Sequence, residues 1–159
     1  MTEKKILIFF DSKNQYDIDH FEFLLKNIDL NKYKIDLIIE ENIKIKTSKK
    51  INIIKFKQPT NILKKYYLKF KLKTKTKYDC AIIYTMESLF GNYIIRKICK
   101  KRIIIADLKD KNFETVEEYR KYFIDRNIYD FNHIIFKNYQ EQEKFIKLYP
   151  SLSKKNRCY

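Results

Sequence analysis

Short stretches of uninterrupted apolar residues recur along this chain, and they constrain its fold more than any other feature. An apolar run of about four to eight residues is typical of a strand buried on both faces, as the strands of parallel sheets are. Helix-like stretches separate most of these runs, and the alternation predicts a Rossmann-like α/β fold, a parallel sheet with helices on both faces. The expected strands are residues 5–11, 34–40, 51–56, 80–84, 102–106 and 133–136.

Apolar residues spaced three and four apart mark the expected helices. Asp17 or Asp19 can cap the first of them. Thr115 followed by Glu118 is the pattern of a capping box. The expected helices are residues 19–28, 62–70, 89–100, 115–126 and 139–148.

The length and composition favour one globular domain covering residues 1–159. Hydrophobic residues make up 45% of the chain, which is enough for a sizeable core. The net charge of +15 favours an anionic partner, although a codon bias toward Lys, Ile, Asn and Tyr gives the same excess. Nucleic acid is not the expected partner, because no nucleic-acid-binding motif accompanies the charge.

Several kinds of site are excluded because the sequence lacks their motifs. The loop after the first strand, DSKNQYDID, has no glycine, so it cannot be the phosphate-binding turn of a dinucleotide or P-loop fold. His20 and His133 stand apart from other metal ligands, and we expect no metal. No GxSxG sequence is present to supply a serine nucleophile.

The cysteines and the N-terminus indicate a cytoplasmic protein. Cys80, Cys99 and Cys158 are odd in number and form no CxxC pair, and the first two fall in apolar patterns expected to be buried. The opening MTEKKILIFF has neither the length nor the cleavage site of a signal peptide.

The loops that follow the strands are where a ligand is expected. In an open parallel sheet, ligands bind beyond the carboxyl ends of the strands. In this chain those loops follow Asp11, Tyr84, Asp107 and Lys137. Acidic side chains in them serve either as ligand contacts or as caps of the next helix.

A basic stretch between the third and fourth strands is a candidate membrane contact. Residues 61–77 carry seven lysines and no acid, with aromatic residues at helical spacing. Lysines attract an anionic bilayer surface and aromatic rings enter its interface, although a solvated helix packed through its rings has the same pattern. The candidate membrane contacts are Lys64, Lys65, Tyr66, Tyr67, Lys69, Phe70, Lys71 and Lys73.

Taken together, several segments resemble the N-terminal, acceptor-side half of family 4-like bacterial glycosyltransferases of the GT-B architecture, which build capsular and other surface polysaccharides. The segments are KKILIFF, LLKNIDLNKYKIDLII, KYDCAIIYTMESLFGNYII, KKRIIIAD and the final YDFNHIIFKNYQEQEKFIKLYPSLSKKNRCY. Their order and spacing, over nearly the whole chain, carry the resemblance.

The resemblance implies transfer of a sugar from a nucleotide-sugar to a glycan or lipid-linked acceptor. It implies acceptor contacts at Asp11, Ser12, Glu87 and Ser88, and a catalytic base or ligand contact at Asp107. No cofactor is expected on this domain, because the donor would bind a C-terminal GT-B domain or partner subunit. The protein would then be cytoplasmic, or peripheral on the inner face of the membrane.

Departures from the family pattern keep a second function open. The usual Gly-Gly turn after the first strand is replaced by residues 12–16, and the usual His by Asp107. A serine of the last turn falls at Lys137 or Asn138, and Ser88 replaces a glycine beside Glu87. The alternative is a non-catalytic Rossmann-like module that binds a partner protein or the membrane.

The single glycine, Gly91, stands near the expected start of a helix. It predicts a tight turn there or a close approach of that helix to the sheet.

Overall fold

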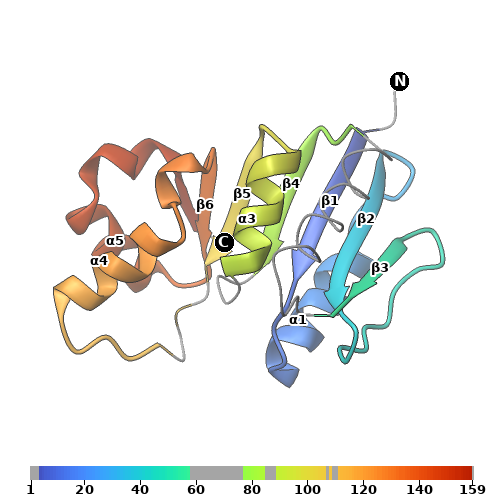
Figure 1. Ribbon diagram of the computed structural model, residues 1–159, viewed down its shortest axis with the longest axis horizontal. Helices are drawn as coiled ribbons and strands as arrows, with labels where there is room; N and C mark the ends of the chain where they lie inside the picture. The colour runs from blue at the N-terminus through green and yellow to red at the C-terminus, as the bar shows by residue number, and fades with distance from the viewer. Residues whose placement is uncertain (1–3, 58–76, 85–88, 107, 109–110, 159) are drawn as a thin grey trace.

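The strands form one parallel sheet. The computed structural model describes residues 4–57, 77–84, 89–106, 108 and 111–158. Within them, seven strands follow the order β3-β2-β1-β4-β5-β6-β7, and all neighbours are parallel (Figure 1). The strands are β1 (Lys4–Phe10), β2 (Tyr33–Glu40), β3 (Asn52–Phe56), β4 (Cys80–Tyr84), β5 (Arg102–Ala106), β6 (His133–Phe136) and β7 (Asn156–Cys158). The predicted Rossmann-like α/β class is confirmed.

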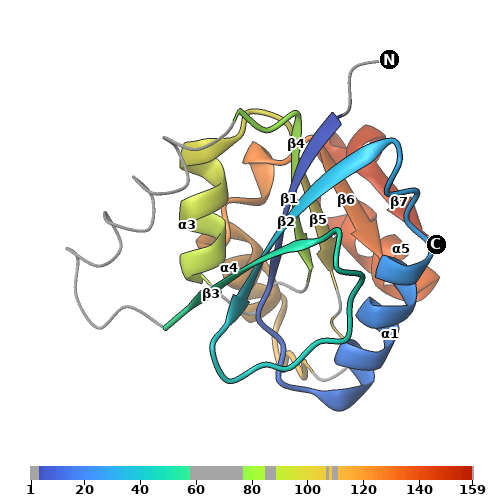
Figure 2. The ribbon, with the colours of Figure 1, turned by 90° about the vertical axis from the view of Figure 1, so that its right-hand side faces the viewer.

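Helices cover both faces of the sheet. Figure 2 shows α1 and α3 on opposite sides of it. Right-handed crossovers explain this: the chain steps from β1 to β2 in one direction and from β4 through β7 in the other, so the connecting helices lie on opposite faces. The described helices are α1 (Gln15–Lys26), α3 (Leu89–Ile98), α4 (Val116–Asp125) and α5 (Tyr139–Leu148), with 3₁₀ turns η1 (Ile128–Asp130) and η2 (Pro150–Lys155).

Alternate residues of the central strand β1 pack into two separate hydrophobic cores, one on each face of the sheet. Ile8 and Phe10 pack with Phe21 of α1, whereas Leu7 and Phe9 belong to the core beneath α3, α4 and α5. Each of these four strand side chains is at most 3% exposed. A fully buried side chain of this size contributes about 1.5–3 kcal/mol, so a strand of this kind requires cover on both sides.

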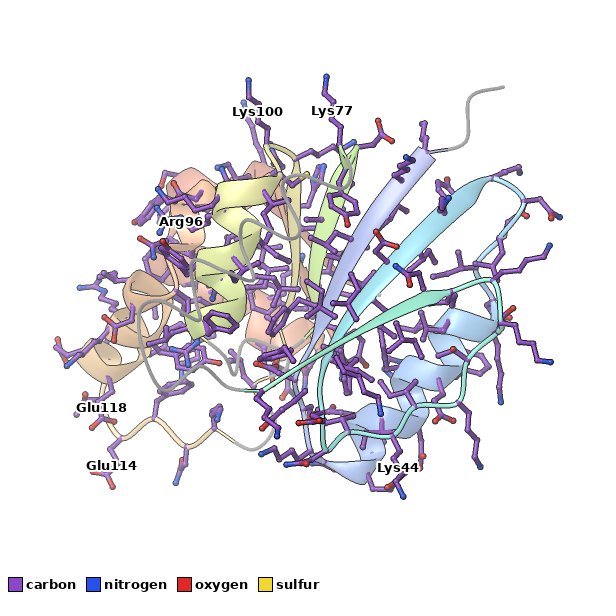
Figure 3. All side chains as sticks on the ribbon, turned by 45° about the vertical axis from the view of Figure 1, so that its right-hand side comes forward. Lys44, Lys77, Arg96, Lys100, Glu114 and Glu118 are labelled. Carbon is purple, nitrogen blue, oxygen red and sulfur yellow. The ribbon has the colours of Figure 1, made fainter. Side chains whose placement is uncertain are left out.

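Caps fix where two of the helices begin. The prediction that the first helix starts at residue 19 with an aspartate cap is wrong: α1 starts at Gln15, because the Asn14 side chain accepts a hydrogen bond from the Tyr16 amide at 3.0 Å. The predicted Thr115 cap is confirmed, since its hydroxyl accepts from the Glu118 amide at 3.1 Å. Glu118 accepts in turn from the Glu114 amide at 2.9 Å, and Figure 3 shows the two glutamates at the same end of α4.

One further difference concerns the end of the sheet at β7, and one prediction stays untested. Strand β7, residues Asn156–Cys158, was not predicted, because three residues are too few to show a pattern. The predicted helix 62–70 lies outside the described residues.

Gly91 lies in the first turn of α3, where the helix approaches β1. A Cβ added there would stand 2.5 Å from Cε1 and 2.6 Å from Cδ1 of Phe9. The Phe9 ring is fully buried and packs against Phe56 and Phe90, with centroids 5.4 and 6.5 Å away. Because the φ angle of Gly91 is not positive, the glycine serves the close approach rather than an unusual backbone conformation.

Gly91→Ala tests this contact. Alanine gains about 0.5–1 kcal/mol of helix stability over glycine, but overpacking a core costs about 1–3 kcal/mol. We expect a net loss near 1 kcal/mol, seen as a fall of about 2–4 °C in the thermal midpoint by circular dichroism. Adding Phe9→Leu should relieve the overlap, so that Gly91→Ala costs less in that background. An alanine variant as stable as the wild type would contradict a tight contact.

Candidate functional site

The carboxyl ends of β1 and β4 lie side by side at the point where the strand order reverses. Phe10 of β1 is paired in register with Tyr84 of β4. The chain leaves β1 toward β2 on one side, while β4 leads toward β5 on the other, so a crevice for ligands is expected between their connections. Side chains from the end of β4 and from just after β1 and β6 gather on the α1 side of this edge.

A buried carboxylate, Asp17 in the first turn of α1, holds the gathered residues together. Its Oδ2 accepts a hydrogen bond of 2.6 Å from the Ser12 hydroxyl, and its Oδ1 lies 3.1 Å from the Lys137 ammonium. Only 12% of each side chain of the Asp17–Lys137 pair is exposed. A buried charge is tolerated when it is both paired and hydrogen-bonded, as this carboxylate is.

Aromatic rings surround the Lys137 ammonium. Its nitrogen lies 4.8 Å from the centroid of the Tyr84 ring and 5.9 Å from that of Tyr16, within the range of cation–π attraction. The Nδ1 atom of His20 lies within hydrogen-bonding distance of the Tyr84 hydroxyl, and the His20 and Tyr16 rings are nearly parallel. We call Ser12, Asp17, His20, Tyr84 and Lys137 the edge cluster.

A second ion pair joins the loop after β1, which carries Ser12, to β2. The Lys13 ammonium lies 3.2 Å from Oε2 of Glu40, the last residue of β2. The Glu40 side chain is 10% exposed, whereas that of Lys13 is 66% exposed. Water therefore screens this pair more than it screens Asp17 and Lys137.

The structure places two of the predicted acceptor contacts at this edge. Asp11 and Ser12 directly follow β1 and are 7% and 5% exposed. Ser12 belongs to the edge cluster, where its oxygen also accepts a hydrogen bond of 3.2 Å from the Asn14 amide. The predicted contacts at Glu87, Ser88 and Asp107 lie outside the described residues, as does the whole set of candidate membrane contacts between residues 64 and 73.

Sequence reasoning missed four members of the edge cluster. Tyr84 ends β4 and Lys137 follows β6, so the rule that ligands bind at carboxyl ends marks both positions. Asp17 was interpreted as a turn or capping residue and His20 as structural or exposed. Nothing in their spacing shows that residue 17 meets a side chain 120 positions away.

The described cysteines are unsuited to nucleophilic work. Burial raises the pKa of the Cys80 thiol to about 11 and also raises the pKa of Cys99, so both stay protonated near neutral pH. Cys99 is buried as predicted, while Cys80 is only partly buried. Within the described ranges, no group of three or more His, Cys, Asp or Glu side chains is arranged to hold a metal ion. No described helix is both long enough and apolar enough to span a bilayer.

The edge cluster offers groups that can bind and orient a ligand. Both oxygens of the Asp17 carboxylate already have partners, Ser12 and Lys137. The Ser12 hydroxyl donates to Asp17 and accepts from Asn14, which leaves one lone pair for a further hydrogen bond. Tyr16 is 60% exposed and offers a flat apolar ring beside these groups.

Comparisons with known proteins establish the fold. The sequence matches no known family profile and no curated protein. The structure is similar to TcCGT1 in complex with UDP, with a TM-score of 0.56 and 8% identity over 99% of this chain and 50% of that one. It is also similar to Phytolacca americana UGT2 complexed with UDP-2fluoro-glucose and pterostilbene, with a TM-score of 0.53 and 7% identity over 100% of this chain and 54% of that one.

Both neighbours are glycosyltransferases of the GT-B architecture, so the predicted GT-B-like fold is confirmed. At this level of identity the likeness concerns the fold alone. The chain spans about half the length of the structures it matches.

Lys137→Met tests the ion pair of the edge cluster. The substitution keeps the length of the side chain but leaves a buried carboxylate without its counter-charge, and we expect a loss of roughly 3 kcal/mol in urea unfolding. Asp17→Asn in the same background should recover part of it, with a coupling energy of about 1–3 kcal/mol.

Lys57→Met is the matched control, because it removes a lysine from a pair whose side chains are both exposed, 83% for Lys57 and 49% for Glu41, and should cost less than about 1 kcal/mol. Equal losses for the two lysine variants would show that the Asp17–Lys137 pair contributes no more than a surface contact.

Proposed function

We propose that this chain is the acceptor-side domain of a GT-B glycosyltransferase. The enzyme would move a sugar from a nucleotide-sugar to a surface-polysaccharide or lipid-linked acceptor. The observation that carries the proposal is the edge cluster, which lies at the reversal of strand order in a fold shared with half of two GT-B glycosyltransferases. The family resemblance of the sequence adds to it.

Acceptor binding fits the chemistry at this edge. A pyranose presents C–H groups on its faces and hydroxyls around its rim, and so matches an exposed aromatic ring beside hydrogen-bonding groups. The Tyr16 ring can receive such a face, and the remaining lone pair of Ser12 can accept a hydrogen bond from one hydroxyl. Asp11, Glu87 and Ser88 are proposed as further acceptor contacts, and Asp107 as the base or a ligand contact.

The donor site is proposed for a second GT-B domain or a partner subunit. The chain covers about half of each neighbouring structure, and both of those were solved with a UDP ligand. We propose that the domain binds no cofactor of its own and that transfer activity belongs to the complete two-domain assembly.

Oligosaccharide titration of the isotope-labelled chain, followed by amide NMR, tests the proposal. We expect saturable shifts at Ser12, Tyr16, His20 and Lys137, because acceptor sugars would contact these groups directly. Tyr16→Ala should weaken binding about tenfold or more, since it removes the exposed stacking surface. The exposed Tyr129, which is 53% accessible and lies in η1, provides a matched control as Tyr129→Ala.

Shifts confined to the amino edge of the sheet would contradict an acceptor site at the edge cluster. So would a complete absence of shifts across neutral and charged oligosaccharides.

One observation favours the alternative, a non-catalytic binding module. The Asp17 carboxylate and the Lys137 ammonium already satisfy each other, so the edge is closed by the chain's own charges. A module of this kind would bind a partner protein without sugar-dependent shifts. The same titration separates the two functions, because only the acceptor domain responds to oligosaccharides.

We also propose peripheral contact with an anionic membrane through the basic segment 61–77. Each lysine near such a surface contributes about 1 kcal/mol, so replacing Lys64, Lys65, Lys69 and Lys71 by Glu should lower partitioning onto phosphatidylserine vesicles tenfold or more. Co-sedimentation at low salt measures this. The matched control reverses four lysines elsewhere, at Lys44, Lys49, Lys50 and Lys55, all of which are exposed. Unchanged sedimentation of the first variant would sink the membrane contact.

A further inference from the structure

A buried asparagine lacks hydrogen-bond partners on the face of the sheet opposite the edge cluster. Asn92, the fourth residue of α3, is 2% exposed. Neither its Oδ1 nor its Nδ2 has a partner among the described residues. Most buried polar atoms in proteins are paired, and leaving an amide unpaired lowers stability, so this residue calls for a physical explanation.

The position of Asn92 on α3 shows which way its side chain lies. Gly91, Ile94 and Ile95 face the sheet, and Arg96, one turn after Asn92, binds Asp130 at 2.7 Å. Residues four apart share a helix face, so Asn92 lies on the flank toward α4, and Figure 3 shows Arg96 pointing to that half of the molecule.

The amide also leans toward the carboxyl edge of the sheet. Helical side chains tilt toward the N-terminus of their helix, and α3 begins just beyond the carboxyl end of β4. Solvent reaches the first turn of α3, since Leu89 there is 53% exposed.

The missing partner must both accept and donate hydrogen bonds. The Nδ2 group donates and the Oδ1 atom accepts, so a bare anion satisfies only one of them and a cation only the other. Adjacent hydroxyls of a sugar satisfy both, because one oxygen accepts from Nδ2 while its neighbour donates to Oδ1. A peptide amide or a water also satisfies both atoms, and a neutral diol is the partner of this kind that an acceptor glycan supplies.

We propose that Asn92 and the first turn of α3 form a subsite for a neutral sugar diol. The subsite lies at the same carboxyl edge as the edge cluster but on the α3 side of the sheet. It rests on the proposed function, because it takes the acceptor glycan as the source of the diol. Sugar binding on the α3 side supplies hydrogen bonds that the described chain does not give to Asn92.

The side-chain amide of Asn92 gives a direct readout. With isotope-labelled asparagine, methyl α-glucopyranoside, galactopyranoside and mannopyranoside are titrated and the Asn92 amide signals followed. We expect a saturable shift with at least one of them and none with tetrahydropyran-methanol, which lacks the ring hydroxyls. Asn92→Leu, whose sugar binding is followed at the backbone amides of the first turn of α3 in uniformly labelled protein, should bind at least tenfold more weakly, while its thermal midpoint rises by about 2–4 °C.

Asn92→Ser serves as the second variant, because it keeps a neutral polar group but is too short to reach two adjacent hydroxyls; it should fold and bind more weakly. Asn42→Leu, in the exposed turn after β2, is the matched control. It should leave sugar binding unchanged and should not raise the thermal midpoint. The subsite is overturned if the Asn92 signals stay still at saturating sugar, or if a long-lived water contacts the amide and no sugar displaces it.

The outcomes separate this subsite from the proposed function. If oligosaccharides bind the wild type and Asn92→Leu equally, the subsite fails and the acceptor domain stands. If simple glycosides shift the Asn92 amide but the edge cluster never responds, the subsite stands and the proposed acceptor site fails.

Discussion

Burial of the central strand β1 on both of its faces is the constraint on which the rest of the structure depends. Its alternate residues supply two cores, so helices must cover both sides of the sheet, and α3 must come close enough for Gly91 to touch the Phe9 ring. Parallel strands in turn require long crossovers, and every helix that follows a strand begins at the same edge. This is why residues from α1, β4 and the end of β6 meet at one place.

Buried polar groups on the two sides of that edge differ in whether the described chain gives them hydrogen-bond partners. On the α1 side, Asp17 uses one oxygen for Ser12 and the other for Lys137, and His20 approaches Tyr84, so the chain satisfies these groups itself. On the α3 side, Asn92 is as well buried but has no partner among the described residues. The sugar subsite proposed for Asn92 would supply the missing partners on that second side.

The sequence was sufficient to predict the fold class but not the composition of the edge cluster. Apolar runs identified the strands from β1 to β6. Strands buried on both faces, such as β1, show little polar alternation, whereas the edge strand β3 is mostly exposed and was identified from its apolar residues alone. The start of α1 was misplaced since two aspartates and Asn14 are all good caps, and only the structure shows which side chain reaches an amide. The ion pair between Asp17 and Lys137 was not predicted, because a contact between distant segments produces no periodic pattern in the sequence.

The distance along the chain between Asp17 and Lys137 has a consequence for synthesis on the ribosome. The strands and helix around Asp17 are synthesised first. Until residue 137 has been made, the Asp17 carboxylate has no lysine to pair with. The first part of the sheet therefore lacks this ion pair at its carboxyl edge while the chain grows. The pair forms only after Lys137 has been made. A polypeptide that ends before residue 137 would keep the buried carboxylate of Asp17 without its counter-charge, which is destabilising.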